Sequence, residues 1–140
     1  MRYLAVDYGT RRIGLAICDE LEIAASPLAQ IRARVRGRFS ADAQAVIQIA
    51  AEYDVAEYVV GLPYNMDGSL GPQAQLCQQF ATALGEVTSR PVHLFDERLT
   101  TEAAKAKLLH AGLTSKKRRA RTDMVAAAVI LQSFLEAKGR

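Results

Sequence analysis

The stretch that decides the fold is YLAVDYGTRRIGLAICDE, residues 3–20. It predicts two short apolar strands, Arg2–Tyr8 and Ile13–Asp19, joined by a tight Gly-Thr-Arg-Arg turn. A connection this short forces the strands to pair antiparallel, because a parallel return needs a long crossover. Buried strands seldom carry an acid. Asp7, at the end of the first strand, therefore calls for a functional explanation.

Past this hairpin the pattern predicts a third antiparallel strand, Glu22–Ile31, followed by alternating helices and strands. Pro27 places the third strand at a sheet edge or beside a bulge. This order predicts one α/β domain over residues 1–140, with a mixed sheet (an antiparallel three-strand meander plus parallel strands) and helices on both faces. The later elements are expected to be a helix capped by Ser40 with Asp42 in its first turn, a strand over 56–63 ended by Gly61 and Pro63, a helix over Pro72–Val87, a strand over 91–97, a helix capped by Thr100 or Thr101 that runs to His110 and stops at Gly112, and a helix over Thr122–Ala137.

The composition favours a globular, cytoplasmic protein. Half of the residues are hydrophobic and 24% are charged, which argues against wholesale disorder. The apolar runs are short and no basic-then-apolar leader opens the chain, so we expect neither a membrane span nor a secretory signal. Cys18 and Cys77 lie far apart without a CxxC pair or clustered histidines. Their placement argues against a zinc site and against a disulfide framework.

Positive charge is concentrated in two short stretches. The net charge is only +3, yet RARVRGR (residues 32–38) holds four of the 18 lysines and arginines and KKRRAR (116–121) holds five. Clustered cations suit a nucleic-acid partner, because each neutralised phosphate releases condensed counterions. One basic run alone is more often a solvated loop. Two in a small domain favour nucleic-acid binding, although the role of 32–38 stays open.

Three acids stand where a carboxylate is unusual. Asp7 ends the first strand, Glu97 follows the last strand, and Asp123 opens a helix that is apolar almost all round. Ligands of open α/β sheets bind beyond the carboxyl ends of the strands, so we expect these carboxylates to meet there. Each acid also has an ordinary explanation. Asp7 could accept turn hydrogen bonds, Glu97 could pair with Arg98, and Asp123 could complement the helix dipole.

Three ionised carboxylates at one sheet edge would repel one another unless a multivalent cation neutralised them. Oxygen ligands without His or Cys select Mg²⁺ or Mn²⁺ over zinc. Two such ions can stabilise the attacking and leaving oxygens of an in-line phosphoryl displacement. Beside two basic stretches, this constellation predicts a two-metal nuclease.

Four motifs in the same order resemble those of the YqgF (RuvX) family, and together they span the chain nearly end to end. They are AVDYGTRRIGLA (5–16), VVGLPYNMDGSLGP (59–72), FDERLTT (95–101) and TDMVAAAVILQSFL (122–135). The resemblance implies an RNase H-like fold related to Holliday junction resolvases. It also implies a nuclease that processes the precursor of 16S ribosomal RNA in the bacterial cytoplasm during ribosome biogenesis.

The resemblance further implies residue roles. Asp7, Glu97 and Asp123 are implied to be the catalytic and metal-binding carboxylates of a hydrolase of phosphodiester bonds. The GTRR turn and the NMDGS loop are motif positions close to them, and the basic run at 116–119 suits the phosphate backbone. The expected substrate contacts are Thr10, Arg11, Arg12, Asn65, Lys116, Lys117, Arg118 and Arg119.

Four further polar residues are expected to be structural. Strand alternation would point Asp96 away from the face that carries the last-strand glutamate. Asp67 precedes a glycine and is interpreted as a turn residue before a metal ligand. His93 lies within a strand and His110 at a helix end. No histidine base is therefore expected.

Other functions stay open at this point. A Holliday junction resolvase would use the same carboxylates on branched DNA and would form a stable dimer. DYGT (7–10) resembles the phosphate-binding turn of actin-like and sugar-kinase folds, but 140 residues leave no room for their second domain. A non-catalytic binding module for RNA or protein would bind without turnover. The expected partners are precursor rRNA and ribosomal precursor particles, or branched DNA, with the chain a monomer or weak homodimer and no membrane involved.

Overall fold

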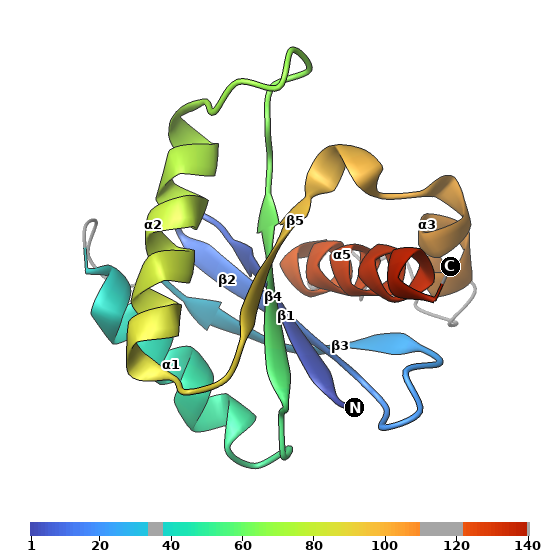
Figure 1. Ribbon diagram of the computed structural model, residues 1–140, viewed down its shortest axis with the longest axis horizontal. Coiled ribbons are helices and arrows are strands. Elements are labelled where there is room, and N and C mark those ends of the chain that lie inside the picture. Colours follow the sequence, from blue (N-terminus) through green and yellow to red (C-terminus); the bar gives the residue numbers. More distant parts are fainter. Residues whose placement is uncertain (34–37, 110–121, 140) are drawn as a thin grey trace.

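A computed structural model describes residues 1–33, 38–109 and 122–139, with the side chains at 107, 109, 122 and 123 outside the description. Figure 1 shows a central sheet with helices against both faces. The elements are β1 (Tyr3–Tyr8), β2 (Arg12–Cys18), β3 (Ala25–Arg32), α1 (Phe39–Ala50), β4 (Glu57–Leu62), α2 (Pro72–Val87), β5 (Val92–Asp96), the 3₁₀ turn η1 (Glu97–Leu99), α3 (Glu102–Leu109) and α5 (Thr122–Lys138).

The strand order is β3-β2-β1-β4-β5, so β1 is central. β1 pairs antiparallel with β2, and β2 pairs antiparallel with β3. β4 and β5 join as parallel strands. The predicted meander and mixed sheet are therefore confirmed. Pro27 meets both expectations at once, because β3 is an edge strand and its pairing register shifts beside that proline.

The two faces of the sheet bury different residues of each strand. Leu4, Val6 and Tyr8 of β1 join the core that α1 and α2 cover. Tyr3 and Ala5 join the core that α5 covers. Since side chains alternate along a strand, Asp7 belongs to the α5 face. Figure 1 shows α1 and α2 on one side of the sheet and α5 on the other.

Several predicted boundaries are wrong. β3 begins at Ala25 and not at the predicted Glu22. α1 begins at Phe39 with Arg38 at its N-cap and no side-chain cap, so Ser40 is not the cap. β4 continues through Gly61 to Leu62, so Gly61 lies inside the strand. β5 ends at Asp96, and Glu97 opens η1.

The remaining helix predictions fare better. The bounds of α2 are as predicted, and the side-chain hydroxyl of Thr101 caps α3 by accepting from the backbone N–H of Ala104 at 2.9 Å. The predicted stop near His110 and Gly112 lies outside the described residues. In the part of the chain that the structure describes, no helix is long and apolar enough to cross a bilayer.

Candidate active site

The site is built on a row of the α5 face in which Asp7 has a glycine on each side. Asp7 pairs directly with Gly14 of β2. On the other side Val6 pairs with Val60 of β4, and the same register carried one residue further sets Asp7 beside Gly61. Neither neighbour has a side chain, so the row of side chains across the sheet has a gap on each side of Asp7.

Glu97 reaches into this gap from the end of β5. A Cβ placed on Gly61 would lie 3.0 Å from the Glu97 Oε2 atom and 2.6 Å from Cδ1 of Ile130, which packs on the strand from α5. Because Gly61 is the neighbour of Asp7, the two carboxylates occupy adjacent positions across the sheet. The sequence predicted this meeting, but it did not indicate that a bare backbone position makes room for it.

The closeness of the two acids affects their electrostatics. Burial, then the negative charge of Asp7, then that of Asp96 raise the pKa of Glu97 from 4.5 to about 7. The buried thiol of Cys77, in α2 behind the sheet, has its pKa raised to about 12 by burial and then by Glu97 and Asp7. The site therefore holds concentrated negative charge in a poorly hydrated place.

The neighbouring arginine does not neutralise Glu97. Arg98 donates to both Asp96 carboxylate oxygens, with Nη2 2.6 Å from Oδ2, and its guanidinium lies 5.2 Å from the centre of the Tyr64 ring. Hydrogen bonding from Arg98 lowers the pKa of Asp96. The alternative of a Glu97–Arg98 pair is wrong, and Asp96 has the structural role expected of it as the cap of η1.

Asp123 lies in the first turn of α5, but its side chain is outside the description. Its position is one turn before Ala127 and two turns before Ile130, both of which are buried against the sheet. The other end of α5 is anchored near the start of β1, where Lys138 and the chain N-terminus both contact Glu22. α5 therefore begins toward the carboxyl ends of the strands, as the prediction requires.

Among side chains that the structure describes, no three acids, histidines or cysteines gather closely enough to hold a metal. Two described carboxylates, Asp7 and Glu97, do converge. Such a hard-oxygen donor pair fits Mg²⁺ or Mn²⁺ in chemistry. Asp123 is the candidate for a third ligand.

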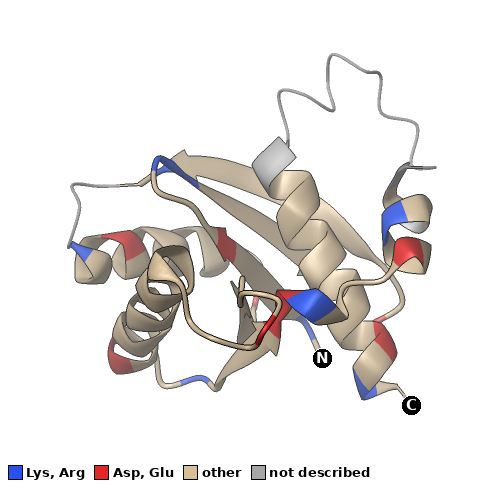
Figure 2. Cartoon of the chain, turned by 90° about the horizontal axis from the view of Figure 1, so that it is seen from above, with Lys and Arg blue, Asp and Glu red and all other residues tan. Residues whose placement is uncertain are grey.

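The predicted substrate contacts on the β1–β2 turn lie at the same end of the sheet. Thr10, Arg11 and Arg12 are exposed. The turn is tight: the N–H of Gly9 donates to the carbonyl of Arg12 at 2.9 Å, and a Cβ on Gly9 would lie 2.6 Å from that oxygen. Figure 2 shows basic segments where β2 begins and β3 ends. The predicted contacts Lys116, Lys117, Arg118 and Arg119 fall outside the described residues.

The loop after β4 holds itself together. Asn65 donates from Nδ2 to the hydroxyl of Ser69 at 3.0 Å. Asp67 accepts from both the N–H and the hydroxyl of Ser69, and Gly68 follows with φ of +88°. Asp67 is thus a turn residue, as interpreted. Asn65 is exposed beside the site, but its amide also supports the loop.

The two histidines were expected to be structural. His93 lies 2.5 Å from Glu57 across the β4–β5 pair, with its ring against Phe134. This placement agrees with the prediction. His110 lies outside the described residues.

The glycines beside Asp7 are the residues that sequence reasoning missed. Gly61 was expected to end its strand, yet both Gly61 and Gly14 lie inside strands. A glycine inside a buried strand weakens it and often marks a close approach. That signal was available in the sequence. Two strand glycines could have been assigned to the site only with the strand register known.

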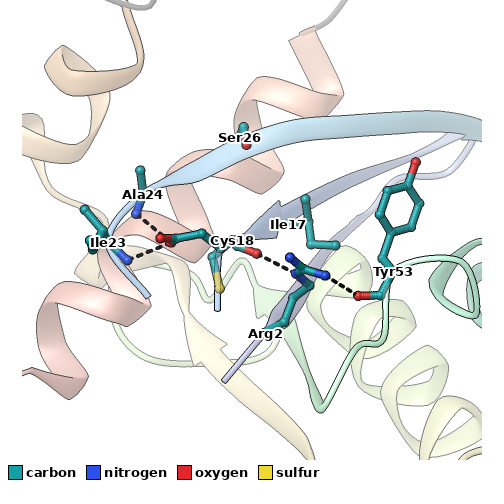
Figure 3. Close-up of a pocket in the computed structure, with 8 residues that line it drawn as sticks. Arg2, Ile17, Cys18, Ile23, Ala24, Ser26 and Tyr53 are labelled. Carbon is teal, nitrogen blue, oxygen red and sulfur yellow. Dashed lines mark hydrogen bonds between the residues drawn. The ribbon is translucent and has the colours of Figure 1, made fainter. Parts of the chain in front are cut away.

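A pocket of about 450 Å³ lies elsewhere, at the amino end of β1 (Figure 3). Arg2 crosses it and donates to the carbonyls of Cys18 at 3.2 Å and Tyr53 at 2.7 Å. The pocket also borders Asp19, whose carboxylate accepts from the N–H groups of Ile23 and Ala24. The two charged groups at this pocket, Arg2 and Asp19, are therefore bound within the protein. This concavity is separate from the acids.

Comparison with known proteins decides the family. A family model described as RuvX, Holliday junction resolvase, matches residues 1–137. The chain belongs to the RuvX family. Curated RuvX relatives carry the provisional name pre-16S rRNA nuclease. One from Moorella thermoacetica is 46% identical over all 140 residues and 98% of its own length, and one from Bacillus thuringiensis is 44% identical over 99% of this chain and all of its own.

Solved structures extend the RuvX comparison at the level of the fold. RuvC of Thermus thermophilus, in complex with a Holliday junction substrate, gives a TM-score of 0.64 at 14% identity, covering 99% of this chain and 96% of its own. The fowlpox virus resolvase gives 0.60 at 11% identity over both full chains. A ROK hexokinase from Thermus thermophilus gives 0.52, but only 39% of its chain is matched. The RNase H-like resolvase fold is confirmed.

Proposed function

We propose that this RuvX protein is a metal-dependent nuclease that hydrolyses phosphodiester bonds in the precursor of 16S rRNA. The observation that carries the proposal is the carboxylate of Glu97 over Gly61, beside Asp7, where burial and charge raise the pKa of Glu97 to about 7. Two acids held together in this way need a cation to be fully ionised. The provisional name of the relatives supports RNA as the substrate.

Asp7, Glu97 and Asp123 would hold two Mg²⁺ or Mn²⁺ ions, with Asp7 central. When bound, such ions supply charge neutralisation, a water of lowered pKa and stabilisation of the departing oxygen. The chain supplies the geometry. β1 fixes Asp7 at the middle of the sheet, η1 brings Glu97 over the bare backbone of Gly61, and the Arg98–Asp96 pair secures η1 from outside.

The substrate backbone would lie across the exposed turn at Thr10, Arg11 and Arg12, and Asn65 of the loop after β4 would add a further contact. The basic run at 116–119 would add to this grip. We place this activity in the cytoplasm, with ribosomal precursor particles as the expected partners. The protein is expected to be a monomer or weak homodimer.

The test is Mg²⁺- or Mn²⁺-dependent cleavage of a structured RNA that carries the 16S precursor end. Wild-type protein should cut it, EDTA should stop the reaction, and Asp7→Asn should be inactive while folded. Cutting by a folded Asp7→Asn protein at the wild-type rate would end the proposal. Binding that survives both chelation and the loss of Asp7, with no cutting by the wild type, would point to a non-catalytic binding module.

A second candidate is a Holliday junction resolvase, which the family description and the resolvase fold favour. Symmetric cutting of two strands requires two active sites. A four-way junction in the same assay, together with the molecular mass in solution, separates the two functions. Preferential cutting of the junction by a stable dimer would favour the resolvase.

A further inference from the structure

Arg12 and Arg32 stand directly opposite each other at the end of the sheet where the acids lie. They are Cα partners at the first residue of β2 and the last residue of β3, and both are exposed. Backbone hydrogen bonds hold this corner on both sides. Gly9 donates to the carbonyl of Arg12, and Ala33 donates to that of Arg11, both at 2.9 Å.

The pair lies on the same face of the sheet as Asp7. Ile13 and Ile31, the strand neighbours of the two arginines, contact the core under α1 and α2. Alternation therefore sends Arg12 and Arg32 to the α5 face. Strand spacings of about 4.8 Å and a rise of about 3.3 Å per residue place their Cα atoms about 8 and 12 Å from that of Asp7.

Like charges directly opposite on neighbouring strands destabilise a sheet. In the residues that the structure describes, neither Arg12 nor Arg32 forms an ion pair. Other cations of the described chain are used differently: Arg98 pairs with Asp96, and Lys138 pairs with Glu22. An anion bound between Arg12 and Arg32 would offset the repulsion between these two arginines beside the acids.

We propose that Arg12 and Arg32 form a clamp for the phosphodiester backbone of the nucleic-acid strand, on the β3 side of the active site. The guanidinium fork matches phosphate oxygens in geometry. With Cα atoms about 8 and 12 Å from that of Asp7, the clamp lies within a few nucleotides of the bond that Asp7 addresses. The inference rests on the proposed nuclease function for its substrate, and it assigns the direction in which the strand leaves the site.

The experiment measures binding without cleavage. Fluorescence anisotropy of a labelled single-stranded RNA in EDTA, across a series of salt concentrations, compares wild type with Arg12→Gln, Arg32→Gln and Arg32→Glu. Arg90, an exposed arginine just before β5 at the opposite end of the sheet, provides the controls Arg90→Gln and Arg90→Glu, which have identical changes in net charge.

Each Gln variant should lose about threefold to tenfold in affinity, and the slope of log affinity against log salt should fall by about 0.7 for each phosphate that the variant no longer neutralises. Arg32→Glu should lose most, because the new carboxylate pairs with Arg12 and occupies the clamp. The same substitution should leave the melting temperature equal or higher, since it replaces repulsion with attraction. The Arg90 variants should bind nearly as wild type.

Wild-type affinity and salt slope in Arg32→Glu would overturn the clamp, and so would an equal loss in Arg90→Glu. A fall in melting temperature of the Arg32 variants would assign the arginine to stability instead. No cleavage is measured, so an inactive wild-type protein would remove the nuclease proposal and leave this test intact. Conversely, unchanged RNA binding by the Arg32 variants of a protein that does cleave RNA would remove the clamp and leave the nuclease proposal intact.

Discussion

The two ends of the sheet use charge in opposite ways. At the amino end of β1, Glu22 contacts the chain N-terminus and Lys138, and hydrogen bonding from Lys138 lowers its pKa. Arg2 there donates to two backbone carbonyls. At the carboxyl end, burial and the nearby charge of Asp7 raise the pKa of Glu97 to about 7. The amino end pairs its charges within the protein, whereas at the carboxyl end like charges lie beside one another: Glu97 near Asp7, and Arg12 opposite Arg32.

A concave surface is therefore not by itself a reactive site. The charged groups that line the pocket at the amino end, Arg2 and Asp19, already have protein partners. The carboxyl end offers Glu97, whose ionisation is opposed by burial and by the charge of Asp7. Only the second arrangement gains free energy when a cation binds. Substitutions at the two ends should therefore have different consequences.

The largest expected effect is the loss of cleavage when Asp7 is replaced, compared with the replacement of an acid at the amino end. Asp7→Asn should lower the Mg²⁺-dependent cleavage rate by about 10³-fold or more, since metal-held charge stabilisation is worth several kcal/mol in such reactions. Asp54→Asn is the matched control, because Asp54 is exposed at the far end with φ of 54°, which asparagine tolerates. Single-turnover cleavage measures both. Similar cleavage rates for the two variants would mean that the two ends of the sheet do not differ in their importance for catalysis.

The second prediction concerns the bare position beside Asp7. Gly61→Ala should lower the free energy of unfolding by about 1–3 kcal/mol through overpacking and should also reduce cleavage, because its Cβ would meet both Ile130 and Glu97. Adding Ile130→Val should recover stability without recovering activity. Gly85→Ala, on an open helix surface with nothing within 4 Å, should be neutral or stabilising. Recovery of full activity in the double variant would exclude a role for Gly61 in positioning Glu97.

The third prediction is that the free energy of unfolding depends on pH when no metal is bound. The pKa of Glu97 is raised from 4.5 to about 7, so the folded state binds a proton more tightly than the unfolded state. The unfolding free energy should therefore fall as pH rises from about 4.5 to 7, by on the order of 1–3 kcal/mol. Melting curves in EDTA from pH 5 to 8 measure it.

Glu97→Gln should remove most of that pH slope, and Mg²⁺ should flatten it in the wild type by stabilising the ionised carboxylates. A wild-type slope equal to that of Glu97→Gln would mean that Glu97 ionises normally. The acids would then lie further apart than the structure places them.

The smallest effect should come from the amino end. Arg2→Ala removes hydrogen bonds to the carbonyls of Cys18 and Tyr53 and should cost about 1–2 kcal/mol of stability. Below the melting temperature the cleavage rate should not change, because this end holds none of the proposed ligands. Chemical denaturation and kinetic assay are the two readouts. A loss of rate larger than the loss of folded protein would show that the two ends are coupled.

Much of the fold could be predicted because its signals are local. The hairpin between β1 and β2 follows from a four-residue turn between apolar runs, and α2 was predicted over the same residues that the structure gives it. The N-terminus of α1 could not be predicted, because Ser40 is a good cap in isolation. In the protein Asp42 is buried and accepts from the Tyr8 hydroxyl at 2.6 Å. Tertiary contacts of this kind override the local cap preference.

Local patterns were sufficient to predict the central strand with its acid, the antiparallel meander, and the meeting of Asp7 and Glu97 at the carboxyl edge. These follow from short-range periodicity and chain direction. The folded structure was needed to show that Gly14 and Gly61 flank Asp7, that Arg98 pairs with Asp96 instead of Glu97, and that Arg12 lies opposite Arg32. Such relations depend on the pairing register between strands distant in the chain, and a shift of one residue would turn every one of these side chains to the other face.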